Sequence, residues 1–182
     1  MDNTILLIVD VQHGLIDADP YNTKGLIQNI QTLIQNAREN DVEIIYIQHN
    51  GGASSGLERG SKGWEIYHEI SPEPTDKVFT KTFNSSFKET GLHEYLQVKG
   101  INRIILVGML TNYCVDTTCK VAFELGYRVI IPQSATTTFD SDFLSGEATV
   151  NYYEQKIWNG RIADVMPVSE IVKEMPQKYM DY

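Results

Sequence analysis

The sequence is poor in cysteine and has no long apolar run. Its 182 residues include two cysteines, Cys114 and Cys119, too few for the disulfide framework of a small secreted domain. Five residues apart on a helix, they would point in different directions, so neither a disulfide nor a shared metal ion is expected. No apolar stretch approaches the roughly 18 residues of a membrane span, and residues 5–9 are too few for a signal-peptide core. These absences predict a cytoplasmic protein with free thiols and no membrane contact.

Basic residues are also scarce. There are 15 Lys and Arg against 24 Asp and Glu, which gives a formal net charge of −9. This balance argues against nucleic acid as a partner, because phosphate contacts need a basic surface. The chain has 42% hydrophobic residues, no low-complexity tract and no Pro/Gly-rich linker. We therefore expect one globular domain over residues 1–182.

Short aliphatic runs alternate with helical patterns along the chain. Strands are predicted at residues 4–9, 42–47, 77–80, 104–107, 127–131 and 162–165. Helices are predicted at residues 26–40, 89–98, 112–125, 144–158 and 168–174. This alternation predicts a three-layer α/β/α domain with a mostly parallel sheet of about six strands.

Three ionisable residues follow predicted strands: Asp10, Lys81 and Cys114. Ligands of such sheets bind outside the carboxyl ends of the strands, so these side chains are the candidates for chemistry. A cysteine near a helix start, beside a lysine, would favour the thiolate, and a carboxylate could exchange its proton. The same residues have structural alternatives: a buried apolar cysteine, a helix-capping or metal-binding aspartate and a solvated lysine. Spacing alone thus indicates a site and not a reaction.

Three segments carry a family resemblance. LLIVDVQ (residues 6–12), VFTKTFNSSF (78–87) and VGMLTNYCV (107–115) resemble, in order, the signature segments of the isochorismatase-like cysteine hydrolases. That superfamily includes nicotinamidases, N-carbamoylsarcosine amidases, ureidoacrylate amidases and isochorismatases. The segment GSKGWEI (60–66) is similar to one found in many members that are not nicotinamidases.

The resemblance implies a role for each candidate. Asp10 would be the general acid and base, Lys81 would stabilise the thiolate and the transition state, and Cys114 would be the nucleophile. It also implies a cis peptide bond between Met109 and Leu110. The N–H groups of Leu110 and Cys114 would then form the oxyanion hole.

The segment after the second predicted strand departs from the nicotinamidase pattern. Nicotinamidases hold a metal ion through an Asp-x-His segment, but here Ile47 stands at the place of the aspartate and His49 at that of the histidine. His68 is the other nearby histidine, so a residual site of His49 and His68 stays open. We expect no metal and no cofactor.

Several residues are candidates for binding the substrate. Gln12 offers polar contacts, and five aromatic residues offer apolar walls: Trp64, Phe83, Phe87, Tyr113 and Phe139. For each of them, core packing or turn capping is the alternative. The glycine-rich loop at residues 50–62 would be either a mobile lid or part of a subunit interface.

Together these features predict a metal-independent cysteine amidohydrolase that cleaves the C–N bond of a small amide or carbamoyl compound through a thioester. The alternatives are isochorismatase activity, nicotinamidase or pyrazinamidase activity, and a non-catalytic member of the fold that binds a small molecule. The resemblance further implies a homodimer or homotetramer.

Overall fold

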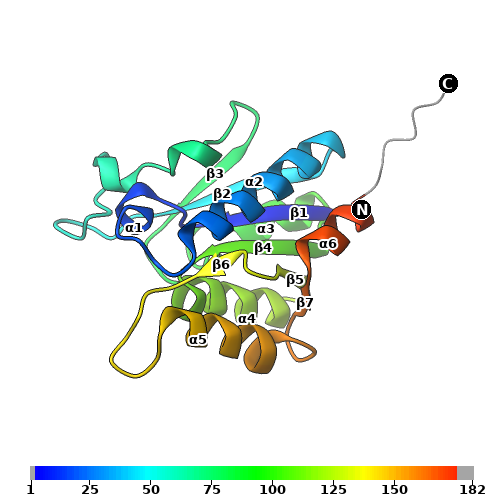
Figure 1. Ribbon diagram of the computed structural model, residues 1–182. Helices are drawn as coiled ribbons and strands as arrows, with labels where there is room; N and C mark the ends of the chain where they lie inside the picture. The colour runs from blue at the N-terminus through cyan, green and yellow to red at the C-terminus, as the bar shows by residue number, and fades with distance from the viewer. Residues whose placement is uncertain (1–2, 176–182) are drawn as a thin grey trace.

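Seven strands form one sheet in which each pair of neighbours runs parallel (Figure 1). This computed structural model describes residues 3–175. The strands are β1 (Thr4–Val9), β2 (Glu43–His49), β3 (Lys77–Lys81), β4 (Arg103–Met109), β5 (Arg128–Pro132), β6 (Thr136–Thr137) and β7 (Asp164–Met166). Their order is β3-β2-β1-β4-β5-β7, and β6 pairs with the end of β4. The predicted parallel α/β sheet is confirmed, with β6 as an additional two-residue strand.

The helices are α1 (His13–Ile16), α2 (Thr23–Glu39), α3 (Leu92–Val98), α4 (Asp116–Glu124), α5 (Gly146–Tyr152) and α6 (Val168–Glu174). Two π-helical segments, η3 (Thr111–Val115) and η4 (Tyr153–Trp158), adjoin α4 and α5. Single 3₁₀ turns form η1 (Lys62–Trp64) and η2 (His68–Ile70). The helices predicted at residues 112–125 and 144–158 are therefore each part α-helix and part π-helix. No helix within residues 3–175 has the length and apolar character needed to cross a membrane.

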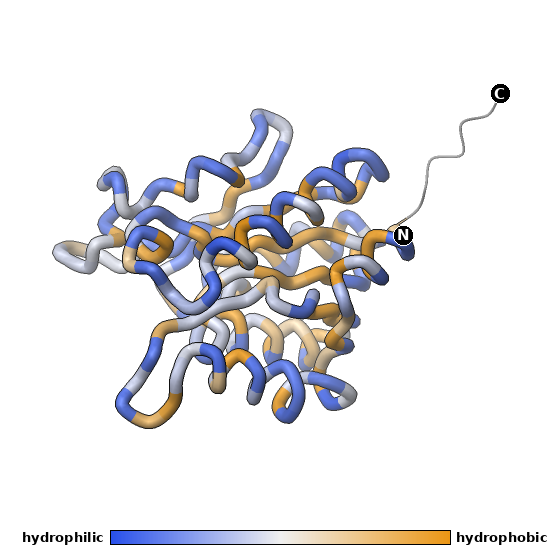
Figure 2. Tube along the Cα trace, viewed as in Figure 1, coloured by the Kyte–Doolittle hydropathy of each residue, from blue (hydrophilic) through white to orange (hydrophobic). Residues whose placement is uncertain are grey.

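The core lies on both faces of the sheet. All six residues of β1 are buried, and their side chains alternate between the faces because successive Cβ atoms of a strand point in opposite directions. Leu6 and Ile8 join the cluster under α2 and α6, whereas Leu7 and Val9 join the cluster under α3 and α4. Figure 2 shows apolar residues along the central strands and polar residues on the outer helix faces. This is the predicted three-layer arrangement. The single domain predicted over residues 1–182 extends beyond the described residues at both ends.

The backbones of β1 and β4 meet closely at their carboxyl ends. Gly108 in β4 has a φ of +125°, and a Cβ atom on it would lie 2.1 Å from the carbonyl oxygen of Val9. Only glycine fits this conformation and this approach. Directly after β1, Asp10 has a φ of +54°, a left-handed conformation that aspartate tolerates better than most residues. The chain therefore turns sharply as it leaves the sheet, at the edge where ligands bind in this class of fold.

Candidate active site

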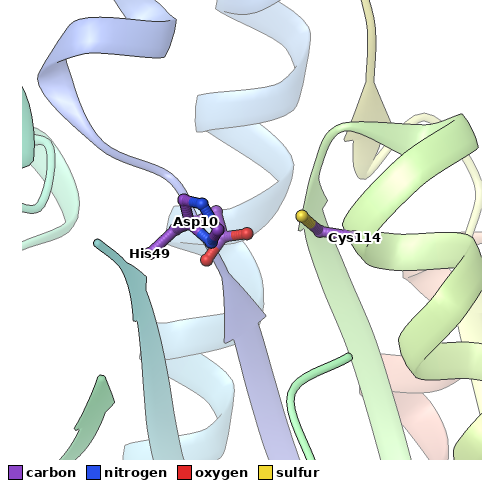
Figure 3. Close-up of side chains that lie close together, drawn as sticks. All are labelled: Asp10, His49 and Cys114. Carbon is purple, nitrogen blue, oxygen red and sulfur yellow. The ribbon is translucent and has the colours of Figure 1, made fainter. Parts of the chain in front are cut away.

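Four polar side chains converge at the carboxyl ends of neighbouring strands. Asp10 follows β1, His49 ends β2, Lys81 ends β3, and Cys114 lies in η3 after β4. Because the sheet order is β3-β2-β1-β4, these strand ends are adjacent. In Figure 3, Asp10 and His49 lie together and face the Cys114 sulfur from the opposite side of the site. The structure thus brings together the three residues that the sequence analysis proposes for catalysis, with His49 beside them.

Lys81 lies at the centre of this group. Its Nζ is 2.7 Å from Asp10 Oδ2, 3.1 Å from His49 Nδ1 and 3.2 Å from Cys114 Sγ. It also donates to the carbonyl oxygen of Phe83 at 3.0 Å. The side chains of Lys81 and Asp10 are almost completely buried. The ammonium is therefore a fixed positive charge between the carboxylate and the sulfur.

The surroundings of Cys114 favour the neutral thiol. Burial raises its pKa to about 12, the charge of Asp10 raises it as well, and Lys81 acts against both. This corrects the expectation of a thiolate favoured by a helix start. Cys114 lies in a π-helical segment, α4 begins only at Asp116, and desolvation outweighs the lysine.

Burial also raises the pKa of Asp10, against the opposing effects of Lys81 and Cys114. Lys81 is the ion-pair partner of the carboxylate, and no described residue donates a hydrogen bond of regular geometry to either of its oxygens. The carboxylate is therefore free to accept a proton from the sulfur. One negative charge, on oxygen or on sulfur, matches the one positive charge of Lys81.

His49 is held in place by Gln12. The His49 N–H donates to Gln12 Oε1 at 2.8 Å, and Gln12 Nε2 donates to the carbonyl oxygens of His49 (3.0 Å) and Trp64 (2.7 Å). Gln12 is completely buried, and both of its amide protons are used. This corrects the expectation that Gln12 binds substrate: its side chain instead joins the end of β2 to η1.

The donor set does not suit a metal ion. Ligand atoms of Asp10, His49 and Cys114 lie within 4.8 Å of one another, the spacing of a metal site. However, Lys81 Nζ is within 3.2 Å of an atom of each, so its ammonium already fills the position of a cation. His68 does not join them: its ring stacks on His13, with centroids 5.2 Å apart and planes at 10°.

The turn that carries Cys114 is fixed by β4 and β6. The Met109–Leu110 peptide bond is cis, as the resemblance implies. The N–H groups of Tyr113 and Val115 both donate to the Leu110 carbonyl, which closes the π-helical turn. Two threonine hydroxyls from the β6 region hold the same turn. Thr111 Oγ1 donates to Thr136 Oγ1 (3.0 Å), and Thr138 Oγ1 donates to Asn112 Oδ1 (2.6 Å). The oxyanion hole of Leu110 and Cys114 N–H groups stays a prediction on this turn.

The five aromatic candidates do not form one wall. Tyr113 is 54% exposed beside Cys114, and Phe83 is partly exposed with the Lys88 ammonium 3.7 Å from its ring centroid. Trp64 is half-buried next to Gln12, and Phe139 lines a separate hollow with Tyr21 and Asp140.

Phe87 requires a correction. Its ring stacks on Tyr127, which lies at the amino end of β5, away from the carboxyl ends that carry the site. The ring of Phe87 therefore belongs to the core and not to the substrate pocket.

Asn84 is a site residue that the sequence analysis missed. Its side-chain oxygen lies 3.8 Å from Cys114 Sγ, within reach of a weak S–H donor. The available signal was its position three residues after Lys81, within a segment that was already linked to the site.

The loop at residues 50–62 is folded against α1. Asn50 Oδ1 accepts from the N–H groups of Gly52 and Arg59, and the Gly56 carbonyl packs directly on Gly14 and Gly63. This junction keeps the loop beside the site.

Residues 4–159 match the family model of the isochorismatase domain. The chain belongs to the isochorismatase family. A solved structure described as an isochorismatase family protein superimposes with a TM-score of 0.84 at 27% identity, covering 91% of this chain and 99% of that one. Family membership agrees with the resemblance of the three signature segments.

Curated relatives of this isochorismatase-family protein include several hydrolases. A streptothricin hydrolase from Streptomyces noursei is 30% identical over 138 residues, which cover 74% of this chain and 50% of that protein. The ureidoacrylate amidohydrolase RutB of Rhizobium rhizogenes is 29% identical, covering 84% and 77%. Nicotinamidase 3 of Arabidopsis thaliana is 30% identical, covering 75% and 74%. The match thus spans about half the length of the streptothricin hydrolase and about three quarters of the other two.

Proposed function

We propose that this protein is a metal-independent cysteine hydrolase that cleaves the C–N bond of a small amide or carbamoyl compound. The observation that carries the proposal is the buried ammonium of Lys81, which contacts both Asp10 and the sulfur of Cys114. This arrangement supplies a nucleophile, a base and a charge that stabilises either anion. Three relatives named as hydrolases of streptothricin, ureidoacrylate and nicotinamide support C–N bonds as the target.

In the first half of the reaction, Asp10 takes the thiol proton of Cys114 as the sulfur attacks the carbonyl carbon. The negative charge moves from the carboxylate to the sulfur and then to the carbonyl oxygen, always near Lys81. The backbone N–H groups of Leu110 and Cys114 would bind that oxygen. The C–N bond then breaks, and the leaving amine or ammonia receives the proton from Asp10.

In the second half, water hydrolyses the thioester. Asp10, again a carboxylate, takes a proton from the attacking water, and the C–S bond breaks. The sulfur recovers that proton, so the acid product leaves and the site returns to its starting state. No electron acceptor or donor is needed at any step.

The direct test is release of ammonia from a panel of small amides: nicotinamide, pyrazinamide, N-carbamoyl amino acids and ureidoacrylate. Cys114→Ala should abolish turnover and leave the melting temperature nearly unchanged. Cys119→Ala is the matched control, since Cys119 lies completely buried on the inner face of α4, outside the site. It should retain turnover and lose about 1 kcal/mol of stability. Full turnover by Cys114→Ala would overturn the assignment of the nucleophile.

Metal independence is tested on the same substrate. Turnover should be unchanged after dialysis against a chelator, because the Lys81 ammonium already supplies the positive charge. Loss of activity that zinc or iron restores would contradict this part of the proposal.

A further inference from the structure

Asn84 is the exposed member of the group around the sulfur. Its side-chain oxygen Oδ1 lies 3.8 Å from Cys114 Sγ. Asp10 and Lys81, which also lie close to the sulfur, are buried. Asn84 therefore stands on the solvent side of the sulfur, where a substrate enters.

The backbone on both sides of Asn84 is fixed. The carbonyl oxygen of Phe83 accepts from Lys81 Nζ at 3.0 Å. Two residues beyond Asn84, the N–H of Ser86 donates to Thr118 Oγ1 at 3.1 Å, and the two hydroxyl oxygens lie 2.9 Å apart in the core. Because β3 and α4 hold the two ends of this turn, the Asn84 side chain starts from a defined position beside the sulfur.

The carboxamide of Asn84 is nearly unused within the protein. In residues 3–175 its one hydrogen-bond partner is the sulfur, and an S–H group is a weak donor. In the proposed reaction the thiol gives its proton to Asp10, so Oδ1 then has no donor among the described residues. This oxygen is an acceptor that faces the reacting atom and is available to the substrate.

A carbonyl carbon under attack by sulfur carries three groups. In the proposed reaction the oxygen binds the N–H groups of Leu110 and Cys114, and the leaving nitrogen takes a proton from Asp10. The third group stays on the carbon and is left to face Asn84. The carbon comes within roughly 3–3.5 Å of the sulfur before attack. An atom bonded to it can therefore lie at hydrogen-bond distance from an oxygen that is 3.8 Å from the same sulfur.

We propose that Asn84 selects substrates whose third group is an N–H, namely carbamoyl compounds of the form H₂N–CO–NH–R. The N–H of this ureido group donates to Asn84 Oδ1, whereas a simple carboxamide has a carbon at the same position and donates nothing. Hydrolysis breaks the bond to the NH₂ nitrogen and releases ammonia and a carbamic acid, which decomposes to CO₂ and R–NH₂. This inference rests on the proposed function in taking Cys114 as the nucleophile.

The test uses two pairs of substrates in which one N–H is replaced by CH₂: N-carbamoylglycine against succinamate, and phenylurea against phenylacetamide. Ammonia release gives kcat/KM for each compound. Ureas and amides differ in intrinsic reactivity, so the quantity compared between variants is the urea-to-amide ratio within a pair. Asn84→Ala removes the acceptor, and Asn84→Asp keeps an oxygen in its place. Thr82→Ala, an exposed residue of the same segment, is the control.

Asn84→Ala should lower the urea-to-amide ratio roughly tenfold, the effect of one hydrogen bond to the substrate. Asn84→Asp should lower the rate with both compounds, because a second carboxylate opposes the thiolate, but should keep the ratio. Thr82→Ala should change neither rate. An equal loss with both members of each pair in Asn84→Ala would overturn the proposal, because Asn84 would then serve the sulfur and not the substrate.

A binding measurement separates this inference from the proposed function. The two ureas should protect Cys114 from alkylation by iodoacetamide, with an apparent Kd that rises roughly tenfold in Asn84→Ala. Turnover of nicotinamide or pyrazinamide without protection by either urea would overturn the inference and leave the proposed function standing. Protection that depends on Asn84, without turnover of any compound, would support recognition of the N–H while the proposed function fails. Neither turnover nor protection would overturn both.

Discussion

At the scale of single residues, Asp10 and Cys114 share one negative charge. Burial raises the pKa of both groups, and one ammonium stands between them. Ionising both would leave a buried negative charge without a counterion, which is costly in a medium of low polarity. The sulfur therefore becomes a thiolate by giving its proton to Asp10, so nucleophile and base are activated in a single transfer.

This coupling predicts that thiol reactivity and turnover separate in Asp10→Asn. The substitution removes the charge that raises the pKa of Cys114 and leaves Lys81 to lower it, so the thiol should ionise at lower pH. Iodoacetamide should then alkylate Cys114 faster at pH 8, while amide hydrolysis falls by at least two orders of magnitude because no base remains.

The two rates of Asp10→Asn are measured on one preparation, with Asp17→Asn, an exposed carboxylate, as the control. A parallel loss of alkylation and hydrolysis would argue that Asp10 acts only by holding the fold. The melting temperature is part of the measurement, because an unpaired buried Lys81 destabilises the native state by up to about 3–5 kcal/mol.

Residue types at strand ends were enough to predict Asp10, Lys81 and Cys114 as neighbours. The roles of their partners were not predictable, because they depend on directions that a sequence does not contain. Gln12 turns its amide to the backbone of His49, and Asn84 reaches the sulfur from the loop after β3. The raised pKa of Cys114 likewise depends on burial, which spacing alone does not measure.

At the scale of elements, the central strands β1, β2, β4 and β5 were predictable because each contains a short aliphatic run. β6 was not, since Thr136 and Thr137 form a two-residue strand without such a run. The sequence pattern predicts ordinary α-helix where the structure has the π-helical turns η3 and η4. Over a few residues, the spacing of apolar side chains in an α-helix differs too little from that in a π-helix to separate the two. The distortion in η3 is nevertheless the segment that carries Cys114.

The loop at residues 50–62 gives a prediction about packing between elements. A Cβ atom on Gly63 would lie 2.1 Å from the Gly56 carbonyl oxygen, so Gly63→Ala should push the loop away from α1 and η1. We expect a loss of about 1–3 kcal/mol in the free energy of unfolding, as for other overpacked sites, and faster proteolysis within the loop.

The matched control for Gly63→Ala is Gly25→Ala in α2, where the atoms nearest the new methyl group, 2.6 Å away, belong to the exposed side chain of Asn22, which can move aside. That change should be neutral or slightly stabilising, since alanine is the better helix former. Equal losses in the two variants would show that the contact with Gly56 does not hold the loop.

At the scale of the whole molecule, net charge bears on assembly. The family resemblance predicts a homodimer or homotetramer, although copies that each carry a charge of −9 repel one another. Light scattering should give two or four times the 20.6 kDa of one chain, and added salt should stabilise the oligomer by screening. A monomer mass at every protein and salt concentration would contradict the prediction.

The four ionisable residues of the site all come from the half of the sheet that runs β3-β2-β1-β4, and from the first 114 residues of the chain. The segments from β5 onward pack against that half and steady the cysteine turn through β6, but contribute none of those four groups. The ionisable groups of the site thus come from the first part of the chain, and the segments that hold the cysteine turn come from the second. A change in the later segments should therefore reach the four ionisable groups only through the cysteine turn that the β6 region holds, and not by removing a group that takes part in the chemistry.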